Sequence, residues 1–158
     1  MDTGSFRRAQ IAGLFIISVA GTLVHMSLHS VFSSNMLFGW GEELMSAVQV
    51  EGATLASIAE TAKLPAHEGM SGAMFYVAVV WFTLLMVPAI LPLLSDQKIW
   101  RWVTVIVGAV MTMGGLLDSA FHLTVPEEIP FGLAGMVLST MPGVFGVVFA
   151  FGWAKGGK

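Results

Sequence analysis

The 158-residue sequence contains no cysteine. This absence excludes disulfides, cysteine-ligated zinc, iron–sulfur clusters and thiol nucleophiles. Any metal or haem would have to be held by histidine, methionine, carboxylate or backbone groups. Methionine is abundant, with 11 residues, and in an apolar helix it usually serves packing, although its thioether also ligates soft metals.

Charged residues are scarce too. They make up 11% of the chain, whereas a soluble domain carries about 25%. Hydrophobic residues make up 56%, and the mean hydropathy is +0.82, so water is not the only solvent of this protein. The net charge of −3 and the lack of a basic patch argue against a nucleic-acid partner. Phosphate-binding glycine loops and the H-E-x-x-H pattern are absent, and no lysine lies within an apolar run to form a retinal Schiff base.

Four apolar runs are each long enough to cross a bilayer, which takes about 20 helical residues. They cover residues 9–32, 69–94, 102–124 and 131–154. We therefore predict an all-α integral membrane protein, a four-transmembrane-helix bundle that forms a single membrane domain over residues 1–158. Because Val31-Phe32-Ser33 resembles a cleavage site, a signal peptide is the competing interpretation of the first run. Pro142 is expected to kink the last run.

The longest polar segment, residues 33–66, separates the first two apolar runs. Leu44, Met45, Val48 and Leu55 recur in it at helical spacing, and Gly52 interrupts the pattern. We expect one or two short amphipathic helices that lie on the outer membrane face. An ordinary surface loop is the alternative.

The basic residues are distributed asymmetrically among the connecting segments. With the N-terminus inside, six of the seven lie on the inner side, namely Arg7, Arg8, Lys98, Arg101, Lys155 and Lys158. The positive-inside rule then predicts a multi-pass protein of the cell inner membrane, with both termini cytoplasmic and residues 33–66 periplasmic or outside. Membrane lipids are one expected partner. Small residues in the last run, such as Gly135, Ser139 and Gly143, favour close packing with other membrane subunits or a second copy of the chain.

Polar side chains cluster at one predicted depth. His25 and His29 form an i, i+4 pair near the outer end of the first run, and Asp118 and His122 form another near the outer end of the third. Residues spaced in this way lie on one face of a helix. Ionisable side chains inside a bilayer are costly and usually have a partner and a function. His67 and Glu68 open the second run on the same side, and Glu43 lies in the outer segment.

Three interpretations of this polar cluster remain open. The first is a metal centre of His25, His29, Asp118 and His122, with His67, Glu68 and Glu43 as possible additional or outer ligands. Copper is the expected metal, with zinc or iron possible. The second is a b-type haem with His29 and His122 as axial ligands. The third is a set of interhelical hydrogen bonds without a cofactor, which would fix the packing of the helices.

The metal interpretation predicts a small inner-membrane protein that serves redox chemistry or metal handling, possibly as a subunit of a larger complex. The alternatives are a cytochrome subunit, a non-catalytic accessory or assembly subunit, and a membrane enzyme that acts on an apolar substrate through histidine and carboxylate acid–base chemistry. The sequence assigns no catalytic residue.

Overall fold

The computed structural model describes residues 3–61 and 72–156, and within these ranges it contains helices and no strands. The first four elements are α1 (Thr3–Gln49), α2 (Leu55–Thr61), α3 (Gly72–Leu94) and α4 (Lys98–His122). The last rod consists of the 3₁₀ turn η1 (Pro126–Glu128), α5 (Ile129–Ala134), the π-helical η2 (Gly135–Thr140) and α6 (Met141–Ala154). The prediction of an all-α protein is therefore confirmed.

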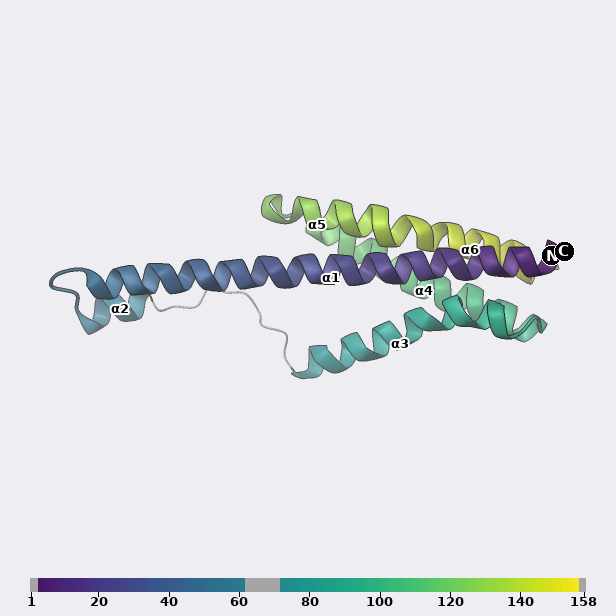
Figure 1. The fold of residues 1–158 in the computed structure, drawn as a ribbon, viewed down its shortest axis with the longest axis horizontal. Helices are drawn as coiled ribbons and strands as arrows, with labels where there is room; N and C mark the ends of the chain where they lie inside the picture. Colours follow the sequence, from purple (N-terminus) through teal and green to yellow (C-terminus); the bar gives the residue numbers. More distant parts are fainter. Residues whose placement is uncertain (1–2, 62–71, 157–158) are drawn as a thin grey trace.

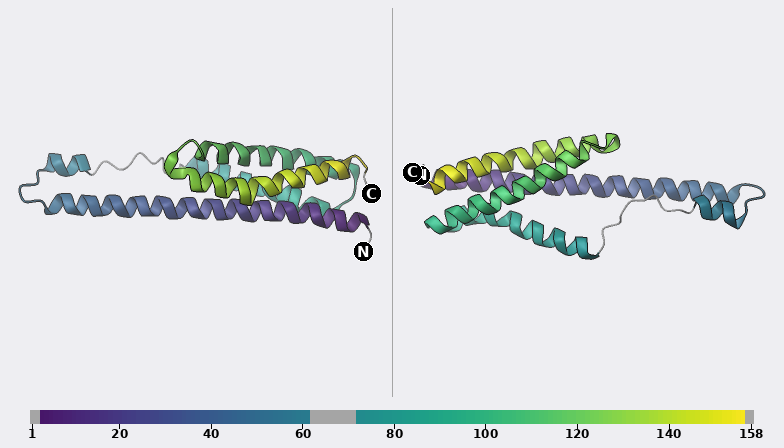
Figure 2. Two further views of the ribbon diagram at one scale, coloured as in Figure 1. Left: turned by 90° about the horizontal axis from the view of Figure 1, so that it is seen from above. Right: turned by 180° about the vertical axis from the view of Figure 1, so that it is seen from behind.

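Four long segments pack side by side with alternating direction (Figure 1). α1 packs against α3 and the last rod, and α4 packs against the same two neighbours, so α1 and α4 lie diagonally opposite each other. The two chain termini meet at one end, which we call the terminal end. α1 extends well beyond the other segments at the opposite, distal end (Figure 2).

Three of the segments are long and apolar enough to cross a membrane, namely α1, α4 and the last rod, Pro126–Ala154. The described apolar part of α3, Val79–Leu94, is shorter, so a fourth span stays a prediction. Large apolar side chains such as Ile17, Ile106 and Val148 are exposed on the outside of the bundle. An apolar surface of this extent is typical of contact with lipid rather than with water.

The first helix is longer than the sequence analysis predicts. The predicted end near Phe32 is wrong, because α1 continues without interruption to Gln49. Within the predicted segment 33–66, α2 is a separate short helix, as one was expected there, and its place on a membrane face stays a prediction. No proline lies between residues 33 and 49, and a glycine in a helix costs only about 1 kcal/mol relative to alanine. The Ser34 and Ser46 hydroxyls donate to carbonyls four residues earlier, so they find partners within the helix. The chain turns only at Gly52, where φ is +84°, and α2 then folds back beside α1.

The apolar core lies in the half of the bundle near the terminal end. It consists of Ile11, Phe15, Ala89, Val105, Ala150, Trp153 and Ala154. Polar contacts close this end. The Trp153 indole N–H donates to Asp96 Oδ1 at 2.9 Å, and Arg101 pairs with Asp96 Oδ2 at 3.1 Å while donating to the Trp153 carbonyl. The buried histidines His25 and His122 lie in the other, distal half of the bundle.

A π-helical segment, η2, interrupts the last rod directly before Pro142. A proline has no N–H, and in an α-helix its ring clashes with the carbonyl of the fourth residue before it, which here is Leu138. The wider π turn avoids this clash. The Leu138 carbonyl lies against Gly21 of α1, where an added Cβ would collide with it. The predicted distortion at Pro142 thus takes the form of a π segment, and Gly21 lets the two backbones approach.

Candidate metal centre

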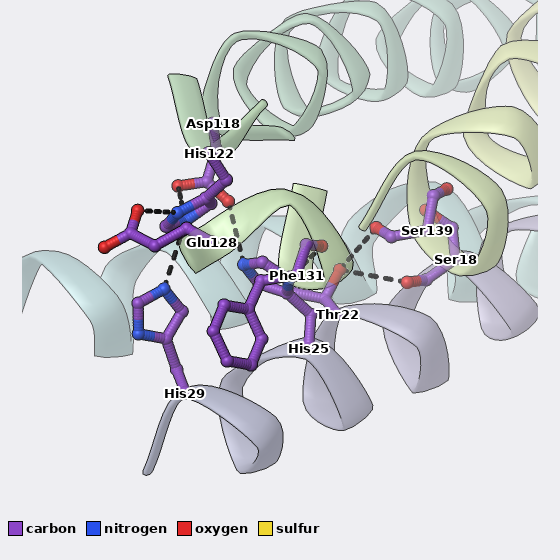
Figure 3. Close-up of polar contacts among 9 residues, drawn as sticks. All are labelled: Ser18, Thr22, His25, His29, Asp118, His122, Glu128, Phe131 and Ser139. Carbon is purple, nitrogen blue, oxygen red and sulfur yellow. Dashed lines mark hydrogen bonds and ion pairs between the residues drawn. The ribbon is translucent and has the colours of Figure 1, made fainter. Parts of the chain in front are cut away.

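Three histidines from two diagonal helices meet at the distal end of the bundle (Figure 3). We call His25, His29 and His122 the histidine cluster. His29 Nε2 and His122 Nε2 are 3.1 Å apart, and the ring centroids of His25 and His122 are 5.2 Å apart. One nitrogen from each ring lies within 4.8 Å of one nitrogen from each of the other two. The three side chains are therefore close enough to hold one metal ion.

The cluster arises from the two i, i+4 pairs of the sequence. His25 and His29 lie one turn apart on α1, and Asp118 and His122 lie one turn apart on α4. The deeper residues of the two pairs meet, with Asp118 Oδ2 3.2 Å from His25 Nε2. Asp118 Oδ1 is 3.7 Å from His122 Nε2 on its own helix. The four ligands of the predicted metal centre thus lie together.

Two groups of the last rod support the cluster from outside, and sequence reasoning did not identify either. Glu128 Oε2 lies 2.8 Å from His122 Nδ1, and the Phe131 carbonyl oxygen lies 3.2 Å from His25 Nδ1. The Phe131 ring also stacks on His29, with the centroids 5.2 Å apart. The short link between α4 and η1 could have indicated these contacts, because it keeps the start of the last rod close to the end of α4.

Hydrogen-bond accounting shows that the cluster suits a cation. Both nitrogens of His25 face oxygen atoms, but a neutral imidazole has only one N–H to donate. Without a metal, both contacts are satisfied only if one further proton lies between His25 Nε2 and Asp118 Oδ2, on either group. The Nε2 atoms of His29 and His122 face each other, and only one of them can donate the hydrogen between them. A metal ion would replace these protons.

Burial is uneven across the site. His25 is 4% exposed and His122 is 7% exposed, whereas His29 is partly buried. The Asp118 side chain is 56% exposed, even though it contacts two of the rings. Solvent or another molecule can therefore reach the site beside the Asp118 carboxylate, while the imidazoles are held inside the bundle.

Hydroxyl groups continue the polar region from His25 toward the middle of the bundle. Thr22 lies about one turn below His25, and its Oγ1 is 2.7 Å from Ser139 Oγ of η2. Ser18 donates to the Ser139 carbonyl at 2.8 Å. The π segment thus faces α1 with a hydroxyl and a carbonyl, as Figure 3 shows. The sequence analysis did not predict this network.

A cavity of about 280 Å³ lies beside these hydroxyls and reaches His25 and Asp118. Trp81, Phe82 and Leu85 of α3 supply part of its wall. Thr140 of η2 also lines it and is 3% exposed, and its Oγ1 has no hydrogen-bond partner among the described residues. A buried polar atom without a partner costs about 1–3 kcal/mol.

The structure does not bring every predicted ligand to the site. Glu43 lies 14 residues beyond His29 on the same unbroken helix, about 21 Å farther along its axis at 1.5 Å per residue. It is therefore not a ligand in this arrangement. His67 and Glu68 lie outside the described residues.

No protein-family model, curated protein or solved structure matches this chain. A fold class by itself does not define a function, since function depends on the groups of a particular site. The function is therefore inferred from the histidine cluster and the side chains around it.

Proposed function

We propose that this chain is a membrane protein that holds one transition-metal ion at the distal end of its bundle. His25, His29 and His122 would supply nitrogen ligands, and Asp118 an oxygen ligand. The observation that carries the proposal is the convergence of three imidazole nitrogens within 4.8 Å. Two nitrogens bound at 2.0–2.1 Å to a tetrahedral ion lie about 3.4 Å apart. His29 and His122, at 3.1 Å, are already near that separation.

The outer contacts of the histidines support the same proposal. A histidine that ligates a metal usually donates its other ring N–H to a carboxylate or a backbone carbonyl, which fixes the tautomer and the ring orientation. Glu128 stands in that position for His122, and the Phe131 carbonyl stands in it for His25. Each contact leaves the Nε2 atom directed toward the centre of the cluster.

The donor set limits the metal. Imidazole nitrogens suit copper, zinc, iron and nickel, and no cysteine is present to select a thiolate-bound ion. Copper is our first choice, because it binds such sites most tightly among the divalent first-row metals. The exposed Asp118 is a ligand that water or an incoming molecule can replace. We therefore propose metal handling or redox chemistry at the outer face of the inner membrane, with a larger membrane complex as a possible setting.

The geometry favours a metal ion over a b-type haem. Axial ligands lie on opposite faces of a porphyrin, with their nitrogens about 4 Å apart and the ring between them. The His29 and His122 nitrogens instead approach each other to 3.1 Å, and Phe131 stacks on His29.

A purely structural cluster is the second candidate, and the contact of His25 with Asp118 favours it. An interhelical hydrogen bond of this kind typically contributes about 0.6 kcal/mol in a membrane protein. In that case the protein would serve as an accessory subunit, and metal would not bind in a defined ratio.

Elemental analysis distinguishes these candidates. The protein, purified in detergent, is loaded with Cu(II) or Zn(II), freed of excess metal, and measured by plasma mass spectrometry and absorption spectroscopy. We expect about one ion per chain without a Soret band, and loss of that ion in the His25→Ala/His122→Ala variant. Ser30→Ala is the matched control, since the exposed Ser30 hydroxyl donates to the Met26 carbonyl of its own helix and has no other hydrogen bond among residues 3–61 and 72–156.

Each of the other outcomes has a distinct meaning. Metal retained by a folded double-histidine variant would contradict the assigned ligands. A Soret band in the purified protein would support the haem alternative. A folded wild-type protein that binds neither metal nor haem would support the structural role.

A further inference from the structure

We propose that the cavity beside the histidine cluster binds a small ring compound that carries a carbonyl group, of the quinone class. This inference goes beyond the metal centre and does not depend on it. The cavity has a volume of about 280 Å³ and is lined by residues of α1, α3, α4 and the last rod. It lies next to His25 and Asp118.

The two sides of the cavity differ in chemistry. α3 contributes Trp81, Phe82 and Leu85, so its part of the wall is aromatic and apolar. α4 contributes both the apolar Met111 and the polar residues Thr112, Asp118 and Ser119. α1 and η2 contribute the hydroxyl-bearing side chains Ser18, Thr22, Ser139 and Thr140. Small-molecule sites typically combine an apolar lining with a few polar groups that fix orientation. A flat ring with a polar edge matches this division.

The Thr140 hydroxyl is a buried hydrogen-bonding group in the cavity wall that a ligand can satisfy. Other helical hydroxyls in this chain, such as those of Thr83 and Thr104, donate to the carbonyl four residues earlier. Thr140 ends the π segment, where this register is changed, and its Oγ1 has no partner among the described residues. The side chain is 97% buried and lines the cavity. It is therefore available to donate to a ligand acceptor, which a ring carbonyl provides.

The size and lining of the cavity restrict the ligand further. Ligand pockets commonly have volumes of about 300–1,000 Å³, so this cavity suits one or two fused rings rather than a larger molecule.

Binding of 1,4-naphthoquinone tests the inference directly. The protein is stripped of metal with a chelator, kept in detergent, and titrated while tryptophan fluorescence and binding heat are recorded. We expect saturable binding, quenching that is reduced in Trp81→Phe, and at least fivefold weaker binding of naphthalene, which has the same rings without an acceptor. Because no metal is present, the result is separate from that of the metal experiment.

Three variants locate the site. Thr140→Val removes the hydroxyl at nearly constant shape and should weaken naphthoquinone binding about five- to tenfold, whereas Thr140→Ser should retain it. Gly115→Val should weaken binding more than tenfold, because a Cβ at Gly115 lies 3.5 Å from Thr140 Oγ1 and its branches would fill the cavity. Met113→Ala, on the exposed side of α4, is the matched control.

The inference is overturned if naphthoquinone does not bind to the folded wild-type protein, or if naphthalene binds equally well. Decanol, a simple acyl-chain mimic, serves as a competitor. If decanol displaces naphthoquinone fully and the protein binds naphthalene as well as naphthoquinone, the cavity binds acyl chains instead. If Thr140→Val fails to fold, the comparison of naphthoquinone with naphthalene on the wild type and the Gly115→Val result still decide the matter.

Discussion

Glu128 Oε2 lies 2.8 Å from Nδ1 of His122, across the tight turn that connects α4 to the last rod. This contact requires the N–H of His122 to be on Nδ1, because a carboxylate only accepts. The lone pair of His122 is then on Nε2, which is directed at His29. Glu128 therefore determines which nitrogen of His122 is offered to a metal, although Glu128 itself does not point into the cluster.

Replacing Glu128 should weaken metal binding without removing a ligand. Loss of such an outer partner typically lowers metal affinity about 10–100-fold, because the ligand ring is no longer held in one tautomer and orientation. We expect this reduction for Glu128→Ala, measured by competition with a chelator of known affinity. Glu127→Ala is the matched control, since Glu127 is the exposed neighbour in the same turn. Equal affinities for the two variants would show that the contact has no such role.

Metal binding should depend on pH, because the metal competes with protons for the cluster. Affinity should fall as the pH is lowered from about 8 to about 5.5, the range in which imidazoles gain protons. In Asp118→Asn the His25 ring no longer faces a carboxylate and can stay neutral. Calorimetry in two buffers of different ionisation heat should therefore record fewer protons released by this variant. Unchanged proton release would contradict the presence of an extra proton between His25 and Asp118 in the metal-free protein.

Gly21 should be essential for packing in the middle of the bundle. A Cβ at Gly21 would collide with the Leu138 carbonyl, and overpacking of this kind costs about 1–3 kcal/mol. Gly21→Ala should therefore lower the Tm measured in detergent. Gly13→Ala, on the same helix with no other atom within 4 Å of the added Cβ, should be neutral or stabilising by up to about 1 kcal/mol. Similar Tm values for both variants would contradict the close contact of α1 with η2.

The sequence was sufficient to predict an all-helical chain and the two polar pairs, because both depend on periodicity along one helix. His25, His29, Asp118 and His122 were predicted to share a depth, and the fold brings them together. Glu128 escaped prediction because its position depends on how the turn after α4 bends. Phe131 escaped for a different reason: it contributes a backbone carbonyl, which no side-chain pattern reveals.

The end of the first helix was predicted wrongly, because the sequence becomes more polar near Ser33 whereas the backbone stays helical to Gln49. The loss of hydrophobicity there was interpreted as the end of a helix, but helix formation depends on propensity and hydrogen bonding as well as on burial. The π segment could be located only in part. Pro142 indicates a local distortion, whereas the form of that distortion depends on packing against Gly21.

The length of α1 has a mechanical consequence. Its 47 residues correspond to about 70 Å, more than twice the thickness of a hydrocarbon core of about 30 Å. Gln49 therefore lies about 30 Å beyond His29 on the same rigid rod. A tilt imposed at that far tip would swing His25 and His29 relative to Asp118 and His122, which belong to a different helix. Forces applied to the protruding end of α1 would therefore change the distances within the histidine cluster.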